Sequence, residues 1–492
     1  MHTQIGKIFN IFEMIYITMM ENQGNNKLTW RERIGLSSGE LAQNLIYQTV
    51  SIWLLFFYTN VYGLKPEVAA VMFLVVRIID IIWDPIVGAF VDKSNLRWGK
   101  YRSWLIIGGV LLATFAILCF WNGFSGSLLY AYITYVGMSM CFTLVNVPYG
   151  SIQSSVTRDP EEITLLTTIR MLFANFGGLV IKTLPLVIAI FAPKVLNPDT
   201  GKMEAVYNTP EAGSAWFITM TIFALIGLGL FFFCFAESKE RIAMNKEQTA
   251  TVKVSDLFNE LVQNRQLRIL SFFFIVAFIT MSVSNAADSY FMTYNINATP
   301  FMTTVFMWLG TIPAFILLPL VPAMKRKFGQ RGMFRLFLII AIAGMALMYI
   351  FVSIPSLKAC FPLLCIAQLV KSSGILVATG YMWALVPDVV TYGEYLGGRR
   401  IAGIVNAIIC FFMKAGMALG GVIPGLVLSW VGFKAASQNQ TPLAEQGILW
   451  LVTIVPALLF VLAIVIISKY ELDDNKMKEI IQAIESRNND AQ

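Results

Sequence analysis

The sequence predicts an all-α polytopic membrane protein whose twelve transmembrane helices form two halves of six. Three observations support this prediction. Of the 492 residues, 57% are hydrophobic and only 13% are charged, whereas soluble domains usually carry about 25% charged residues. Apolar stretches of about 20 residues, the length that crosses a bilayer as a helix, recur along the chain. The polar segment 237–266 divides these stretches into two equal groups.

Each apolar stretch is long enough to span the hydrocarbon core as a helix. The segment between the sixth and seventh stretches mixes both charge signs with few large apolar residues, so we expect a linker there. The spans are expected near residues 39–60, 68–91, 103–122, 128–150, 168–192, 214–236, 268–292, 301–323, 334–354, 360–387, 402–431 and 448–469.

Basic residues are unevenly distributed between the two sides of these spans. Cytoplasmic loops of membrane proteins are enriched in lysine and arginine, which predicts that both termini are cytoplasmic. The net charge of +7 then follows from topology, and we expect no nucleic-acid partner. With this orientation the outer loops hold no arginine and only Lys65, Lys194, Lys202, Lys358 and Lys434.

These spans define the expected domains of the chain. The apolar stretch Ile8–Met20 is too short for a span and contains Glu13, so it is not counted, and translation is expected to start at Met1 or Met20. The domains are an N-terminal cytoplasmic segment (1–36), a six-helix bundle (37–236), a central cytoplasmic linker (237–266), a second six-helix bundle (267–469) and a cytoplasmic tail (470–492).

The composition argues against an enzyme. The single histidine is His2, and no nucleophile motif or metal-ligand spacing is present. All six cysteines fall in apolar runs without paired spacing, which indicates free, buried thiols. We expect no cofactor.

The two halves resemble each other in sequence. The basic segment 97–102 (RWGKYR) follows the second span, and 327–331 (KFGQR) follows the eighth. A repeat of six plus six spans is the arrangement of major facilitator transporters, whose binding sites lie near the bilayer midplane between the halves. The sequence therefore predicts a major facilitator fold.

Three charged residues interrupt the second span: Arg77, Asp80 and Asp84. A charge near the bilayer centre costs at least about 2.5–3.5 kcal/mol on insertion scales, so such residues are expected to face a protein interior. At about 100° per residue, both aspartates lie within roughly 60° of Arg77 on one helix face. This face can hold a cation or a proton. The alternative, in which Arg77 only pins helices together through one aspartate, leaves the other carboxylate unexplained.

Two other spans carry polar stripes at helical spacing, which typically line a cavity. For each asparagine in them, the alternative is an interhelical hydrogen bond worth about 0.6 kcal/mol. The stripes are Glu40, Asn44, Tyr47 and Ser51 on the first span, and Ser139, Thr143, Asn146 and Gly150 on the fourth.

Several of these residues belong to a longer pattern. The run RIIDIIWDPIVG at 77–88, with Asp92 and RWGKYRSW at 97–104, resembles the glycoside-pentoside-hexuronide:cation symporters, relatives of melibiose permease. The resemblance extends over about residues 28–470 and includes YTNVYGL (58–64), NVPYGS (146–151), Arg170, PDVVTYGEY (387–395), Arg400 and Lys414.

The resemblance implies a secondary active symporter that imports a glycoside, pentoside or hexuronide with Na⁺ or H⁺ by alternating access. The alternatives are a transport-defective sugar sensor and a lipid carrier of the same superfamily. It further implies two sets of residues. They are a cation-coupling set of Asp80, Asp84, Thr143 and Lys414, with the two aspartates holding any Na⁺, and a sugar-binding set of Asn44, Arg77, Asn146, Tyr149 and Arg170. Charged residues of the inside loops are expected to form ion pairs that hold the halves together as a cytoplasmic gate: Asp92, Arg97, Arg102, Asp388, Glu394 and Arg400.

The chain departs from melibiose permease at several positions. Trp83 stands where that protein has an amide at its cation site, and an indole supplies no oxygen ligand, which favours H⁺. Asn44 and Asn146 replace two sugar-binding aspartates, and Gly150 replaces a tryptophan. The two amides favour a pentoside, a neutral β-glycoside or a hexuronide over a galactoside, and the glycine leaves room for a larger or differently placed substrate. Lys182 and Asp288 match no family role, and we expect them nearer the outer face.

The expected partners are a small sugar or glycoside, a monovalent cation or proton, and the lipid bilayer. We expect a functional monomer in a bacterial cell membrane.

Overall fold

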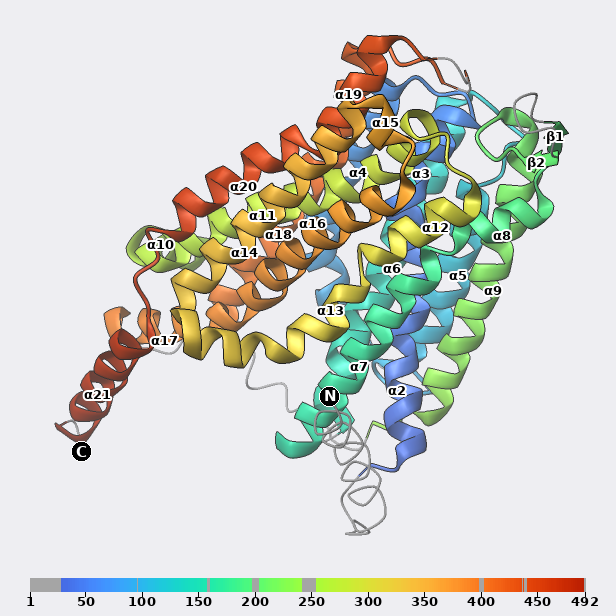
Figure 1. The fold of residues 1–492 in the computed structure, drawn as a ribbon. Coiled ribbons are helices and arrows are strands. Elements are labelled where there is room, and N and C mark those ends of the chain that lie inside the picture. Colours follow the sequence, from blue (N-terminus) through green and yellow to red (C-terminus); the bar gives the residue numbers. More distant parts are fainter. Residues whose placement is uncertain are drawn as a thin grey trace, which may run out of the picture.

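The computed structural model describes residues 28–94, 96–156, 160–196, 203–240, 254–397, 402–435, 437 and 440–490. Within these ranges helices dominate, and the only strands are β1 (Lys194–Leu196) and β2 (Met203–Ala205), which pair antiparallel with Val195 opposite Glu204. The helices form two bundles that meet at the end carrying this hairpin and spread apart at the other (Figure 1). The prediction of an all-α membrane fold is confirmed.

The first bundle begins at Trp30. Thr29 caps that helix, and its side chain and that of Glu32 satisfy each other's backbone N–H groups in a capping box. The first helix therefore starts well before the apolar stretch near 39–60. The elements are α2 (Trp30–Gln43), the π-helical turn η1 (Asn44–Gln48), α3 (Thr49–Asn60), α4 (Pro66–Lys93), α5 (Arg102–Cys119), α6 (Leu128–Val156), α7 (Pro160–Ile181), α8 (Leu184–Phe191), η2 (Pro210–Ala212) and α9 (Gly213–Glu237).

The second bundle follows a short helix, α10. Its longest helix, α14, breaks at Gly329, whose φ of 67° lies in the left-handed region that glycine adopts without penalty. The elements are α10 (Val254–Gln263), α11 (Arg265–Tyr290), η4 (Phe291–Asn295), α12 (Pro300–Leu309), α13 (Ile312–Leu317), η5 (Leu318–Leu320), α14 (Val321–Ser353), α15 (Pro355–Lys358), α16 (Phe361–Tyr381), η6 (Met382–Leu385), α17 (Val386–Gly397), α18 (Ala402–Trp430), α19 (Pro442–Val452), α20 (Ile454–Ile467) and α21 (Asp474–Asp490).

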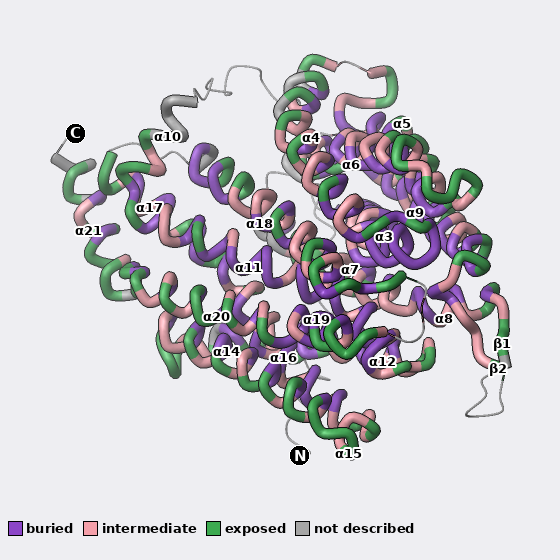
Figure 2. Tube along the Cα trace, turned by 90° about the horizontal axis from the view of Figure 1, so that it is seen from above, coloured by how far each residue is buried: buried purple, intermediate pink, exposed green. Residues whose placement is uncertain are grey.

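Within the described chain, ten helical segments are long and apolar enough to cross a membrane. The other two predicted spans correspond to α2–η1–α3 and α4, which have the length but carry the polar stripe and the three intramembrane charges. Large apolar side chains such as Leu129 and Leu458 are 72% and 65% exposed on the outside of the bundles, and buried residues lie inside (Figure 2). This distribution suits a lipid environment.

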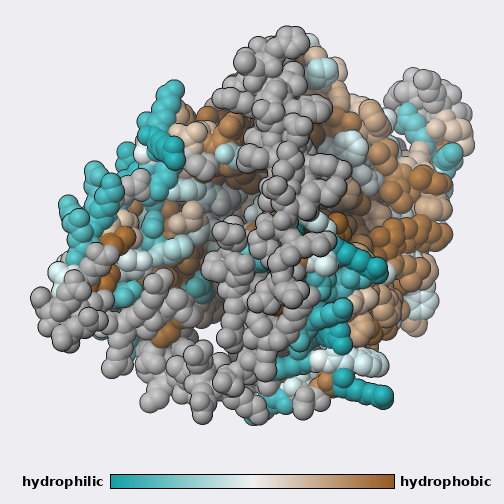
Figure 3. Space-filling model, turned by 90° about the horizontal axis from the view of Figure 1, so that it is seen from below, coloured by the Kyte–Doolittle hydropathy of each residue, from teal (hydrophilic) through white to brown (hydrophobic). Residues whose placement is uncertain are grey.

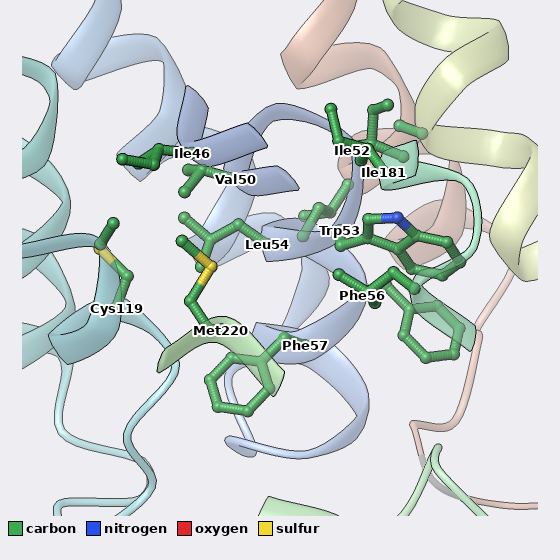
Figure 4. Close-up of a cluster of buried hydrophobic side chains, with 14 of the residues drawn as sticks. Ile46, Val50, Ile52, Trp53, Leu54, Phe56, Phe57, Cys119, Ile181 and Met220 are labelled. Carbon is green, nitrogen blue, oxygen red and sulfur yellow. The ribbon is translucent and has the colours of Figure 1, made fainter. Parts of the chain in front are cut away.

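A tightly packed aromatic cluster fixes α3 within the first bundle. Trp53, Phe56 and Phe57 are completely buried, and Trp53 lies 6.0 Å from Trp216 of α9 between ring centroids. In Figure 4, Leu54 and Met220 lie on one side of α3, and Trp53 and Phe56 on the other. This packing holds the polar stripe of the first span in place.

The two bundles contact each other toward the hairpin end. The hydroxyls of Thr59 and Tyr290 are 2.7 Å apart, and the Tyr294 hydroxyl donates to Asn60. The Trp308 indole also donates to the Leu179 carbonyl at 3.1 Å. These contacts join the bundles in this part of the molecule. At the opposite end hydrophilic side chains gather over much of the described surface (Figure 3).

Helices α4 and α18 approach so closely that Gly425 has no room for a side chain. A Cβ there would lie 2.7 Å from both the Ala70 Cβ and the Pro66 carbonyl oxygen. We expect Gly425→Ala to push α4 from α18 and cost about 1–3 kcal/mol, as overpacking usually does. The melting temperature of the purified protein should fall. The matched control is Gly229→Ala on α9, where a Cβ meets nothing within 4 Å, and equal melting temperatures would contradict the prediction.

Candidate functional site

A cavity with two adjoining lobes lies between the bundles. The larger, here called the Arg77 lobe, has a volume of about 340 Å³, and the smaller, the Lys371 lobe, about 230 Å³. Both lobes are lined by residues of both halves, and they share Gln48, Ile52, Met281 and Asn285. The cavity is thus the place where a ligand can contact both halves at once.

Asp80 lies at the contact of α4 with the first and fourth spans. Arg77 Nη1 donates to Asp80 Oδ2 at 3.3 Å and to the Tyr47 hydroxyl at 2.5 Å. Ser139 Oγ donates to the other carboxylate oxygen at 2.5 Å. The Tyr47 ring stacks on Phe142, with centroids 3.9 Å apart. The guanidinium and the carboxylate are therefore held by three different helices.

Asp84 connects the two halves. Thr143 Oγ1 donates to Asp84 Oδ1 at 3.0 Å, and Lys414 of α18 forms an ion pair with Oδ2. The structure therefore brings together the four residues predicted for cation coupling, Asp80, Asp84, Thr143 and Lys414. Two carboxylates here face one guanidinium and one ammonium, so the cluster has no net formal charge.

Trp83 contributes no oxygen to this cluster. Its indole Nε1 donates to the Met140 carbonyl of α6 at 3.2 Å, so the side chain fills the contact between α4 and α6. The oxygens available to a cation are those of Asp80, Asp84, Ser139 and Thr143. Ser139 belongs to the polar stripe of the fourth span, but the resemblance did not single it out.

Asn44 lies in the Arg77 lobe, within the π-helical turn η1. Its Nδ2 donates to the Glu40 carbonyl at 2.8 Å, and its Oδ1 accepts from Gln48 Nε2. Single π-helical turns inside α-helices often occur at functional sites. The turn therefore presents both amides to the cavity.

Arg170 and Tyr149 form a separate cluster with Glu40. Arg170 Nη2 lies 2.5 Å from Glu40 Oε1, and its guanidinium carbon lies 4.6 Å from the Tyr149 ring centroid. The Tyr149 hydroxyl donates to the Leu36 carbonyl at 2.8 Å. Neither residue is among those that line the two lobes, and Asn146 is exposed on α6 outside them. A role for these three in sugar binding stays a prediction.

Four of the predicted gate residues, Arg97, Arg102, Asp388 and Glu394, lie in described segments at the end where the bundles separate (Figure 1). Arg102 donates to the Ser238 carbonyl at 3.0 Å and to the Trp98 carbonyl, so it is tied within its own half. The Glu394 carbonyl accepts from Arg487 of the tail helix α21 at 3.0 Å. Arg97 is exposed after α4, and Asp388 lies in the first turn of α17. The Asp92 side chain and Arg400 lie outside the described parts, so the gate stays a prediction.

The Lys371 lobe holds polar residues to which the sequence analysis gave no role. Lys371 and Gln368 received no role, yet both are 2% exposed and line the lobe. Lys182 and Asp288, which were expected nearer the outer face, line it as well. In sequence they lie close to Leu179 and Tyr290, whose contacts join the bundles toward the hairpin end. The available signal for Lys371 was an isolated charge inside the tenth apolar stretch, the same kind of signal that marked Asp80.

The chain matches the family described as MFS/sugar transport protein over residues 35–474. It belongs to this family. Its relatives include an uncharacterized symporter, YnaJ, of Bacillus subtilis, 42% identical over 95% of this chain and 97% of the relative. Another is a glucuronide carrier protein homolog of Escherichia coli, 32% identical over 94% of this chain and 97% of the relative. The resemblance to glycoside-pentoside-hexuronide:cation symporters is confirmed, and this member of the MFS/sugar transport family is a transporter and not an enzyme.

Solved structures support the fold of this family member. The nucleoside transporter NupG superimposes with a TM-score of 0.61 at 11% identity, covering 89% of this chain and all of that one. A D-xylose-proton symporter gives a TM-score of 0.59 at 15% identity, covering 90% of this chain and 98% of that one. The chain therefore has the major facilitator fold of a multi-pass membrane protein.

The ion pair between the halves predicts a thermodynamic coupling between Asp84 and Lys414. Removing one partner leaves an uncompensated charge, which costs about 3–5 kcal/mol in a fully buried pair and less here, because the side chains of Asp84 and Lys414 are 21% and 35% exposed; removing both is milder still. Lys414→Met should lower the melting temperature, and adding Asp84→Asn should restore much of the loss. Lys476→Met, on the exposed tail helix, is the control. Additive effects of the two substitutions would show that the residues do not interact.

Proposed function

We propose that this MFS/sugar transport protein is a symporter that imports a glycoside, pentoside or hexuronide together with Na⁺ or H⁺. In this proposal twelve spans cross the membrane, both termini are cytoplasmic, and the monomer is the functional unit. Relatives named as symporters, as a glucuronide carrier homolog and as an isoprimeverose transporter support it. They do not favour the sensor or the lipid carrier.

The observation that carries the proposal is the ion pair between Asp84 and Lys414 beside the pair of Asp80 and Arg77. A cation or proton that binds the two carboxylates competes with Lys414 for Asp84. Because Lys414 belongs to the other half, this competition changes a contact between the halves. Binding of the ion is thereby linked to the relative position of the bundles, which is what coupled transport needs.

The arrangement of the bundles fits one state of alternating access. With cytoplasmic termini, the hairpin end is the outer end. The contacts of Thr59 with Tyr290 and of Asn60 with Tyr294 close that side, and the bundles spread apart toward the cytoplasm (Figure 1). We assign this shape to an inward-open carrier. The predicted gate would close in the opposite state; its residues are Asp92, Arg97, Arg102, Asp388, Glu394 and Arg400.

The walls of the cavity fit a ligand rich in hydroxyl groups. Ser51 Oγ, Ser284 Oγ and Gln368 Oε1 lie at its walls and are buried without a hydrogen-bond partner in the described structure. Buried polar groups are costly unless they are paired, and sugar hydroxyls both donate and accept. The amides of Asn44 and Gln48 add donors and acceptors in the same cavity.

The oxygens at the acid pair are compatible with either coupling ion. Hard cations prefer oxygen ligands and usually take about six or more of them. The side chains here reach six oxygens only if both carboxylates bind the cation through both of their oxygens. The residues that supply them are Asp80, Asp84, Ser139 and Thr143. A proton needs only one carboxylate oxygen.

Asp84→Asn tests the coupling role. Purified protein in liposomes should accumulate its sugar under one imposed gradient, either of Na⁺ or of pH. The variant should lose accumulation but retain sugar counterflow, because the amide removes the competing charge and leaves the sugar contacts in place. Glu479→Gln, on the exposed tail helix, should behave as wild type. Full accumulation by Asp84→Asn would refute the assignment.

Asn44→Ala tests the sugar site. The variant loses two polar groups in the Arg77 lobe, so the sugar concentration for half-maximal uptake should rise by about fivefold to tenfold, as the loss of a hydrogen bond of about 1–1.5 kcal/mol predicts. The measurement is initial uptake against sugar concentration for a panel of glycosides, pentosides and uronides. Unchanged half-saturation for every transported sugar would remove Asn44 from the site.

A further inference from the structure

The charges in the Lys371 lobe do not balance. Among the described residues that line it, the charged ones are Lys182, Asp288 and Lys371, which is two ammonium groups against one carboxylate. The Arg77 lobe borders the neutral cluster of two cations and two acids. The two lobes of one cavity therefore differ in charge, and the Lys371 lobe carries a formal excess of one positive charge.

The carboxylate of Asp288 is already engaged on both oxygens. Lys371 Nζ lies 3.2 Å from Oδ1, and Gln368 Nε2 donates to Oδ2 at 3.4 Å. Lys182 Nζ instead donates to the hydroxyl of Thr311 at 2.5 Å. This hydroxyl is neutral and does not compensate the charge of the ammonium group. An ammonium group removed from water is costly unless an anion pairs with it. Lys182 is therefore the group in this lobe whose charge a ligand can compensate.

The local structure aims Lys182 into the cavity. The helix breaks after Ile181, and Pro185 in the first turn of α8 cannot continue the hydrogen bonding of α7. The neighbouring Gly310 leaves space, because a Cβ there would lie 3.0 Å from Gln368 Nε2 and 3.6 Å from Lys182 Nζ. Lys182 and Gln368 thus converge on one spot from opposite halves.

An independent feature of the lobe also indicates a ligand. Gln368 is 2% exposed, and its Oε1 is a buried acceptor without a partner in the described structure, as is the hydroxyl of Ser284. Their unsatisfied polar atoms lie in the same lobe as the excess positive charge. A ligand that carries both an oxyanion and hydroxyl groups would satisfy both features.

We propose that the Lys371 lobe is a subsite for the carboxylate of an acidic sugar, so that the substrate is a hexuronide rather than a neutral glycoside. This inference rests on the proposed function as a sugar carrier. The carboxylate accepts a hydrogen bond from Lys182 and is attracted by the positive charge of Lys371. A neighbouring sugar hydroxyl donates to Gln368 Oε1. Hydrogen bonds between charged groups are roughly twice as strong as neutral ones, so the charge dominates recognition.

The position of the two lysines gives the substrate a second effect. Lys182 belongs to the first half, and Lys371 and Asp288 belong to the second. A carboxylate bound to both lysines joins the halves, much as the pair of Asp84 and Lys414 does in the cluster that borders the other lobe. An acidic sugar would therefore stabilise conformations in which the halves are close at this depth, whereas its neutral analogue would not.

The test compares methyl β-D-glucuronide with methyl β-D-glucoside, which differ only in a carboxylate against a hydroxymethyl group. Binding to the purified full-length protein is measured by calorimetry, and transport by counterflow in liposomes. Wild type should prefer the glucuronide. Lys182→Gln should weaken glucuronide binding by about tenfold or more, as expected for a lost charge-assisted hydrogen bond, and leave glucoside binding unchanged. Lys182→Arg should retain most of the preference.

Two further variants keep the test independent of folding. Gly310→Ala retains every charge but narrows the spot between Lys182 and Gln368, and it should also weaken glucuronide binding selectively. Lys358→Gln changes a lysine near the hairpin end, paired with Glu445 at 3.9 Å, and should behave as wild type. Melting temperatures of all variants show whether each is folded.

The outcomes separate this inference from the function on which it rests. Equal binding of both sugars by wild type, or an equal loss of both in Lys182→Gln, overturns the carboxylate subsite while sugar transport stands. Transport of the glucoside without transport of the glucuronide likewise overturns the carboxylate subsite and leaves sugar transport standing. If neither these sugars nor any of the wider panel of glycosides, pentosides and uronides is bound or moved under any gradient, the proposed function fails as well.

Discussion

Charges that lie within a membrane must be neutralised by other groups of the protein, and this requirement determines the arrangement of the central helices. Helix α4 carries Arg77, Asp80 and Asp84, whose exposure to lipid would be prohibitive. Their partners come from the first span (Tyr47), from α6 (Ser139 and Thr143) and from α18 (Lys414). Helix α4 therefore has to lie at the junction of the two halves, with its polar face inward and residues such as Ile82, 62% exposed, outward.

The same requirement explains why the two ion clusters cross the boundary between the halves. If all partners of a charged group belonged to one bundle, its interaction energy would not depend on the position of the other bundle. Lys414 reaches Asp84 from the opposite half, and Lys182 lies in the lobe that Asp288 and Lys371 line from the other side. The cluster that borders the Arg77 lobe is balanced, whereas the charges that line the Lys371 lobe have a positive excess, so the two lobes differ in their electrostatic environment.

The sequence was sufficient for the fold and for part of the site. Hydrophobic length and the polar linker predicted the two bundles, and the spacing of Arg77, Asp80 and Asp84 predicted their shared face, because both follow from the local periods of chain and helix. Contacts between distant helices were less predictable. Arg170 was expected to face a sugar, but Glu40 lies close enough to pair with it, and nothing local to Arg170 reveals that neighbour. Likewise, the inward position of Lys182 depends on a helix break at Pro185 and on the space left by Gly310.

A carrier must also be able to leave the state seen in the structure. The outer contacts consist of a few hydrogen bonds, such as that of Thr59 with Tyr290, and of the close approach of α4 to α18 at Gly425. The predicted inner gate consists of surface charges whose pairs contribute about 0–1 kcal/mol each. Exchange between the two states requires that neither closure be much stronger than the other. A ligand can change the balance between two such states only by its differential affinity for them, so in the proposed mechanism it would act through residues that bridge the halves, such as Lys414 and Lys182.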